Sequence, residues 1–166
     1  MAKYKVGDVF LCELEDSVRI FQYVGNDASQ LNSNVIVAFK NMIPKGVEFD
    51  LGDLNKLDTD FYAHVAIDLG VKMKYWRKIG SALPAEWSNI LFRDTNDYGK
   101  SGVTESDDWW VWEPNHAARN IGSLKGEYRK SYIGVVMAPP NILDRLKSGK
   151  YSYFYPAPKG VEPYWE

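Results

Sequence analysis

The segment of residues 107–113 (DDWWVWE) brings acidic and aromatic side chains together in one short element. It holds three of the chain's six tryptophans, and carboxylates stand at Asp107, Asp108 and Glu113. Tryptophan is enriched among the interface residues that carry binding energy. An aromatic surface bordered by carboxylates complements a basic protein surface or a small cation. The segment therefore favours a binding site over a reaction centre.

The alternation of a strand would divide these side chains between two faces. Successive side chains of a strand point to opposite sides, so Trp110 and Trp112 share one face. Trp109, Val111 and Glu113 share the other. We expect at most one face to be core, which makes Trp110 and Trp112 the predicted anchors and the three carboxylates the predicted rim. The alternative is that most of these rings are packed inside the protein.

Acid–base chemistry on a glycoside is a second interpretation of the same residues, with tryptophans that stack sugars. Glycoside hydrolysis uses two carboxyl groups that flank the scissile bond. Asp107 and Asp108 are a poor pair because neighbouring positions on a strand point apart. Glu105 and Glu113 are the better candidates.

Other reaction centres have little support in the sequence. A zinc site needs three or four converging ligands, but His64 and His116 are far apart and follow no spacing motif. Cys12 is the single cysteine, and the alternating pattern around it predicts a buried thiol within a strand. The sequence contains no GxGxxG, no GxxxxGK[ST] and no GxSxG motif. We therefore expect no catalytic residues, no metal and no cofactor.

Length and composition predict one ordinary domain over residues 1–166. Hydrophobic residues make up 45% and charged residues 25% of the chain, close to the average for globular proteins. The net charge of -2 gives no reason to bind nucleic acid. No apolar run is long enough to span a membrane, and the first residues lack the apolar core of a signal peptide. A cytoplasmic protein is expected.

The hydrophobic patterns predict mostly strands. Residues 4–15 and 18–24 should form a hairpin, and residues 35–39, a short β-branched run, should be a buried strand in the same sheet. Residues 40–60 are expected to be a solvated connection. Further strands are predicted at residues 61–67, 132–138 and 151–155, with less defined apolar pieces at 75–80 and 87–93. Residues 94–106 predict a long loop.

One helix is well signalled, at residues 140–148. Pro139 and Pro140 stand at its start, and Gly149 follows its last turn. Together these elements predict a β-rich α+β fold. We expect a bent antiparallel sheet or partly open barrel with one or two short helices.

Charge is distributed unevenly along the sequence. Acidic residues dominate positions 94–113, whereas basic residues dominate positions 119–150. Two interpretations stay open: the protein has an acidic face and a basic face, or the two stretches pair across the fold.

Short segments of the first half carry a family resemblance. Residues 5–10 (KVGDVF) open the first strand, residues 61–65 (FYAHV) lie in the middle, and residues 76–80 (WRKIG) follow. Together they resemble the immunity protein 26 family of bacterial polymorphic toxin systems. Residues 133–146 are compatible with the C-terminal region of that family. Residues 19–23 (RIFQY) depart from it, because the family often has a glycine-containing second strand there.

The resemblance implies a small cytoplasmic protein that binds one cognate toxin domain and blocks it without catalysing a reaction. No family motif fixes the contact residues, so the predicted toxin-binding residues are those of the acidic aromatic segment. They are Asp107, Asp108, Trp110, Trp112 and Glu113. The alternatives are a carbohydrate-active hydrolase and a sugar-binding module. A Trp-rich strand would also serve a homo-oligomer.

Overall fold

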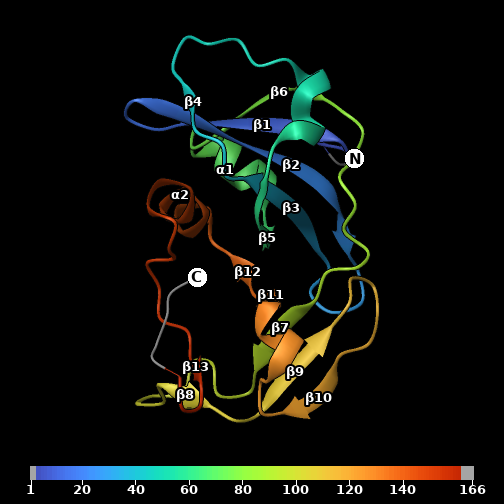
Figure 1. Cartoon of the computed structure of the whole chain (residues 1–166), viewed down its shortest axis with the longest axis vertical. Coiled ribbons are helices and arrows are strands. Elements are labelled where there is room, and N and C mark those ends of the chain that lie inside the picture. Colours follow the sequence, from blue (N-terminus) through green and yellow to red (C-terminus); the bar gives the residue numbers. More distant parts are fainter. Residues whose placement is uncertain (1–2, 162–166) are drawn as a thin grey trace.

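The computed structural model describes residues 3–161, which form one large sheet, a smaller four-stranded sheet and a two-stranded sheet (Figure 1). In the large sheet the neighbours follow the order β12-β5-β3-β2-β1-β6, and β4 pairs with β2. The pairs are antiparallel except for β12 beside β5. Its strands are β1 (Asp8–Glu13), β2 (Ser17–Asp27), β3 (Ser33–Phe39), β4 (Ile43–Pro44), β5 (Thr59–Val65), β6 (Arg77–Ser81) and β12 (Val136–Met137).

The four-stranded sheet has the order β10-β9-β7-β11 and occupies the lower part of Figure 1. Only β11 beside β7 is a parallel pair. The two-stranded sheet pairs β8 with β13 in parallel. The strands of these sheets are β7 (Phe92–Thr95), β8 (Glu105–Ser106), β9 (Trp109–Trp112), β10 (Arg119–Gly122), β11 (Tyr132–Ile133) and β13 (Ala157–Pro158).

Short helices connect or cover the sheets. The α-helices are α1 (Ile67–Lys72) and α2 (Pro139–Ser148), and the 3-10 helices are η1 (Leu51–Lys56) and η2 (Gly126–Lys130). The predicted helix at 140–148 is thus confirmed as α2. Gly149 ends it at a φ of 76°, a left-handed conformation that glycine adopts without a Cβ clash, and its N–H donates to the carbonyl of Arg145.

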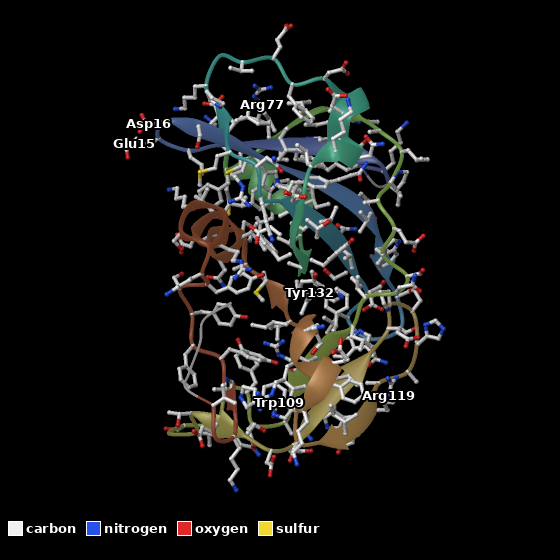
Figure 2. The ribbon with its side chains drawn as sticks, in the orientation of Figure 1. Glu15, Asp16, Arg77, Trp109, Arg119 and Tyr132 are labelled. Carbon is white, nitrogen blue, oxygen red and sulfur yellow. The ribbon has the colours of Figure 1, made fainter. Side chains whose placement is uncertain are left out.

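The predicted N-terminal hairpin is also confirmed. β1 and β2 pair with Val9 opposite Gln22 and Glu13 opposite Val18. Glu15 and Asp16 form its tip, which projects from the large sheet (Figure 2). Cys12 is a fully buried thiol within β1, and burial raises its pKa to about 11.

Both faces of the large sheet are buried, because alternate side chains of its strands enter two different cores. Phe21 and Ile36 point to the side where α2 packs with Ile142 and Leu146. Ile20, Val35 and Val37 point to the opposite side, where Leu54 of η1 and the ring of Trp112 lie. Tyr132 lies between the large and the four-stranded sheets, with its ring centroid 5.3 Å from that of Tyr62 and 6.5 Å from that of Phe92 (Figure 2).

Several predicted elements differ in the structure. The stretch 132–138 splits into β11 and β12, which join different sheets. Residues 151–155 form no strand: Tyr151 and Tyr155 fill the core from an irregular segment. Residues 40–60 contain β4 and η1, whose Leu54 is buried. In each case side chains are buried by contacts distant in sequence, which local patterns do not report.

The β-rich α+β class with short helices is confirmed. The sheets are mixed and none of them closes into a barrel. Within residues 3–161, no helix has the length and apolar character needed to cross a bilayer.

Candidate binding site

The acidic aromatic segment forms β9, in the middle of the four-stranded sheet. β9 pairs with β7 so that Trp110 faces Asp94 and Trp112 faces Phe92 across the ladder. Trp109 and Val111 point to the other face and are fully buried in the core beside Tyr155. The alternation expected from the sequence is therefore present in the strand. Figure 2 shows Trp109 within this sheet.

Trp112 is not an exposed anchor, which corrects the sequence prediction. Only 2% of the residue is exposed, because the large sheet covers this end of the four-stranded sheet. Its Nε1–H donates to Asp27 Oδ2 at 2.8 Å. Its ring presses on Gly134, where an added Cβ would lie only 2.1 Å from a ring carbon. Both faces of β9 are thus core at this position, contrary to the expectation that one face at most would be buried.

Trp110 lies at the open end of the same face and is partly exposed. It lines a hollow of about 460 Å³, the Trp110 hollow, together with Gln30, Leu31, Asp94, Asn96 and Ala117. The Nε1–H of Trp110 is buried and has no acceptor among the described residues. The hollow therefore presents an aromatic ring, whereas the unpaired N–H lies beneath the surface.

Asp94 brings a carboxylate to this hollow from β7. Its Oδ1 accepts hydrogen bonds from the backbone N–H of Thr95 at 2.7 Å and the hydroxyl of Tyr155 at 3.0 Å. Burial raises the pKa of Asp94 above the ordinary 3.8, and these two hydrogen bonds counter only part of that effect. Asp94 was not predicted from the sequence, where it stood in an apparent loop.

The three predicted rim carboxylates have different surroundings. Asp108 is partly buried and is held by Asn96 at 2.8 Å and Asn120 at 2.6 Å. Asp107 is exposed and accepts a hydrogen bond from Ser123, and Glu113 is partly exposed just after β9. Among the three rim residues, Asp108 is connected to the Trp110 hollow, because it accepts a hydrogen bond from Asn96, which lines the hollow.

Asp107 also borders a hollow of about 250 Å³ that contains Lys125, Arg129 and Lys159. The acidic and basic stretches of the sequence therefore meet at this point of the fold. Among the described residues, however, no ion pair within 4.0 Å joins the two stretches, since Lys100 pairs with Asp97 and Lys130 with Glu127.

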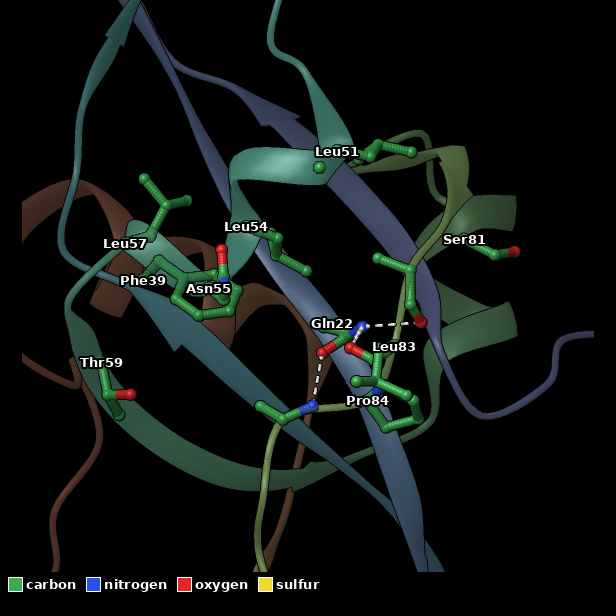
Figure 3. Close-up of a pocket in the computed structure, with 13 residues that line it drawn as sticks. Gln22, Phe39, Leu51, Leu54, Asn55, Leu57, Thr59, Ser81, Leu83 and Pro84 are labelled. Atoms are coloured by element: carbon green, nitrogen blue, oxygen red, sulfur yellow. Dashed lines mark hydrogen bonds between the residues drawn. The ribbon is translucent and has the colours of Figure 1, made fainter.

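A second large hollow, the η1 groove, lies between η1 and residues 81–85 and has a volume of about 530 Å³ (Figure 3). Leu51, Leu54 and Phe39 form one side, and Leu83 and Pro84 form the other. Leu83 is 91% exposed. The groove is therefore an apolar surface separate from the acidic aromatic segment.

The floor of the η1 groove is polar, and its hydrogen bonds are made within the protein. The side chain of Gln22 donates to the carbonyls of Gly7, Ala82 and Leu83 and accepts from the N–H of Ala85. Gln22 thus holds residues 82–85 in place and has a structural role.

A buried polar cluster connects the two larger sheets. Asp27 ends β2, and its Oδ2 lies 3.0 Å from His64 Nε2 while also accepting from Trp112 Nε1. Its Oδ1 accepts from the backbone N–H of Asn115 at 3.0 Å. Asp27 and His64 are fully buried, and the His64 ring lies 4.1 Å from that of Phe92. An Asp–His pair closed to solvent in this way has the geometry of a structural link.

The cluster predicts a loss of stability in acid. Burial lowers the pKa of His64 below the ordinary 6.5, although Asp27 acts in the opposite direction. Burial would raise the pKa of Asp27, but its three hydrogen bonds outweigh burial and hold that pKa below 3.8. For both groups the unfolded chain binds the proton more readily than the folded chain. The contribution of each group to the free energy of unfolding is therefore complete above its ordinary pKa and is lost as the pH falls. We expect the free energy of unfolding to fall below about pH 6.5 and again below about pH 3.8, by up to ~1.4 kcal/mol per pH unit and proton.

Urea unfolding at a series of pH values measures this dependence. His64→Gln, whose side chain cannot bind the proton, should reduce the slope of the free energy of unfolding against pH between about pH 6.5 and pH 5. Equal slopes for the two proteins in that range would show that His64 does not titrate on unfolding.

The described part of the chain contains no group of three or more side chains that could hold a metal ion. Glu105 and Glu113, the predicted acid–base candidates, belong to different sheets: Glu105 lies in β8, and Glu113 follows β9. Comparison with protein-family models, curated proteins and solved structures finds no match to this chain.

Proposed function

We propose that this protein is an immunity protein that binds the toxin domain of a bacterial polymorphic toxin system and blocks it sterically. The three segments that resemble the immunity protein 26 family support this proposal. They lead into or lie in β1, β5 and β6, strands of one sheet. As an immunity protein the chain would act in the bacterial cytoplasm.

The observation that carries the choice of interface is the position of Trp110. A partly exposed indole at the mouth of a hollow offers a large contact area to a partner. Asp94 lines the same hollow, and Asp108 is hydrogen-bonded to its lining residue Asn96, so negative charge lies beside the ring. We expect the ring to supply most of the affinity, and the carboxylates to accelerate encounter and select a basic partner.

Replacement of Trp110 by alanine tests the interface. The variant should bind the toxin domain encoded beside this chain at least about 30-fold more weakly, the equivalent of a hot spot of roughly 2 kcal/mol. Protection of cells that express the toxin should fall in parallel. Binding is measured by calorimetry with the purified toxin domain.

Leu83→Ala is the matched control, because it removes an exposed apolar side chain from the η1 groove and leaves β9 unchanged. Its toxin affinity should equal that of the wild type. The opposite pattern, with Leu83→Ala impaired and Trp110→Ala intact, would move the interface to the η1 groove.

A sugar-binding module is the second candidate function. The Trp110 hollow supports it, because the ring is bordered by the amides of Gln30 and Asn96 and by a carboxylate. Thermal shifts across a glycan panel test this alternative, and turnover of a glycoside by the purified chain would instead favour a hydrolase.

A further inference from the structure

Among the described residues, the Trp110 hollow is lined by one carboxylate and by no cation. Its charged lining residue is Asp94, and its other lining residues are neutral. Among residues 3–161, no ion pair within 4.0 Å involves Asp94. A partly buried carboxylate without a counter-ion is costly, and an entering cation would remove that cost. The hollow is therefore complementary to a positive group.

The hydrogen bonds of Asp94 leave one oxygen for such a group. Both bonds to this carboxylate, from Thr95 and Tyr155, go to Oδ1. No hydrogen bond to Oδ2 is found in the described part of the chain. One oxygen is thus fixed by the protein, which orients the carboxylate, and the other has acceptor capacity for a ligand.

Trp110 adds an aromatic ring on the neighbouring strand. Asp94 and Trp110 are directly opposed across the β7–β9 ladder, so their side chains leave the same face side by side. The ring offers its face to a cation. The ring face and the free carboxylate oxygen together suit a cationic group on an apolar stem.

We propose that the Trp110 hollow receives a lysine or arginine side chain of the partner protein, with its ammonium or guanidinium group at Asp94 and its apolar stem against the ring of Trp110. This inference rests on the proposed function and names the chemistry of the bound group. A neutral sugar would leave the carboxylate without a counter-ion. The η1 groove is the internal contrast, because its lining residues carry no charge.

A titration followed by NMR of the indole N–H groups tests the proposal on the full chain. Trp110→Phe identifies the resonance of Trp110, because the variant keeps an aromatic ring and loses that signal. N-acetyl-arginine amide and N-acetyl-lysine amide supply the cation on its apolar stem, and N-acetyl-glutamine amide is the neutral analogue. We expect the two cationic compounds to shift the Trp110 resonance with saturation in the millimolar range, and the neutral compound to bind roughly tenfold more weakly.

Asp94→Asn should reduce the response to the cationic compounds to that of the neutral one. Its backbone amide spectrum shows whether the sheet is intact, and Leu83→Ala should respond like the wild type. Equal shifts with the neutral compound, larger shifts with methyl glucoside, or no shift with any of them would overturn the inference.

The outcome separates this inference from the proposed function. If Trp110→Ala abolishes toxin binding while the cationic compounds leave the resonance unchanged, the interface stands and the cation pocket fails. If the compounds bind while toxin affinity survives Trp110→Ala, the pocket stands and the toxin interface fails.

Discussion

Asp27→Ala is expected to lower the free energy of unfolding by at least about 3 kcal/mol, because three polar groups lose their acceptor at roughly 1–3 kcal/mol each. The groups are the indole N–H of Trp112, the backbone N–H of Asn115 and the ring of His64. The contacts to Trp112 and Asn115 join the large sheet to β9 and to the loop that follows β9, whereas the contact to His64 lies within the large sheet. The substitution should therefore weaken the attachment of the two sheets as well as the total stability.

Urea unfolding followed by tryptophan fluorescence measures this loss. The slope of the free energy of unfolding against urea concentration also reports whether the transition remains two-state. Asp27→Asn should lose less, because it keeps an acceptor for one of the three groups. Asp16→Ala, at the exposed tip of the β1–β2 hairpin, is the matched control and should stay within about 0.5 kcal/mol of the wild type. A loss below about 1 kcal/mol for Asp27→Ala would mean that the cluster is repaired by rearrangement or water.

The two-residue period of a strand was sufficient to place the side chains of β9 on their faces. It was not sufficient to say which face is covered. Trp110 and Trp112 share a face, yet only Trp112 lies beneath the large sheet. Coverage depends on how two sheets pack, and residues 27, 64 and 112 meet only after both sheets have formed.

The polar residues of the candidate site were harder to predict than its aromatic residue. Asp94 stood in a stretch rich in turn-forming residues, and its pairing with Trp110 requires the register of β7 on β9. A sign was present in the sequence, because residues 90–93 are apolar in part and continue directly into Asp94. Continuation of that strand by two residues would have brought a carboxylate beside the tryptophans.

Arg19 illustrates the same limit in the core. Arg19 lies on the same face of β2 as Phe21 and Tyr23, as the alternation of a strand requires, and α2 covers that face. Its partners could not be deduced, because they come from three other elements. Arg19 donates to the carbonyl of Phe39 at 2.9 Å, to the carbonyl of Leu146 at 3.0 Å and to Asp60 Oδ2 at 2.6 Å.

Asp60→Ala is expected to cost about 3–5 kcal/mol, because it leaves the buried guanidinium of Arg19 without its counter-ion. The side chains of Arg19 and Asp60 are 5% and 17% exposed, so little solvent is available to replace the carboxylate. Arg145 of α2 also lies 3.6 Å from Asp60, so the substitution leaves a second cation beside the position of the lost carboxylate. Thermal and urea unfolding should both report the loss, and α2 should lose amide protection first.

An exposed ion pair supplies the control for this prediction. Glu13 and Arg77 lie 4.0 Å apart with side chains 62% and 63% exposed, so Glu13→Ala should cost at most about 1 kcal/mol. Removal of both charges by Arg19→Met with Asp60→Ala should cost less than the sum of the two single substitutions, since no isolated charge remains buried. Additive losses would instead assign the stabilisation to the two carbonyl contacts of Arg19, with Asp60 serving only to keep the guanidinium in place.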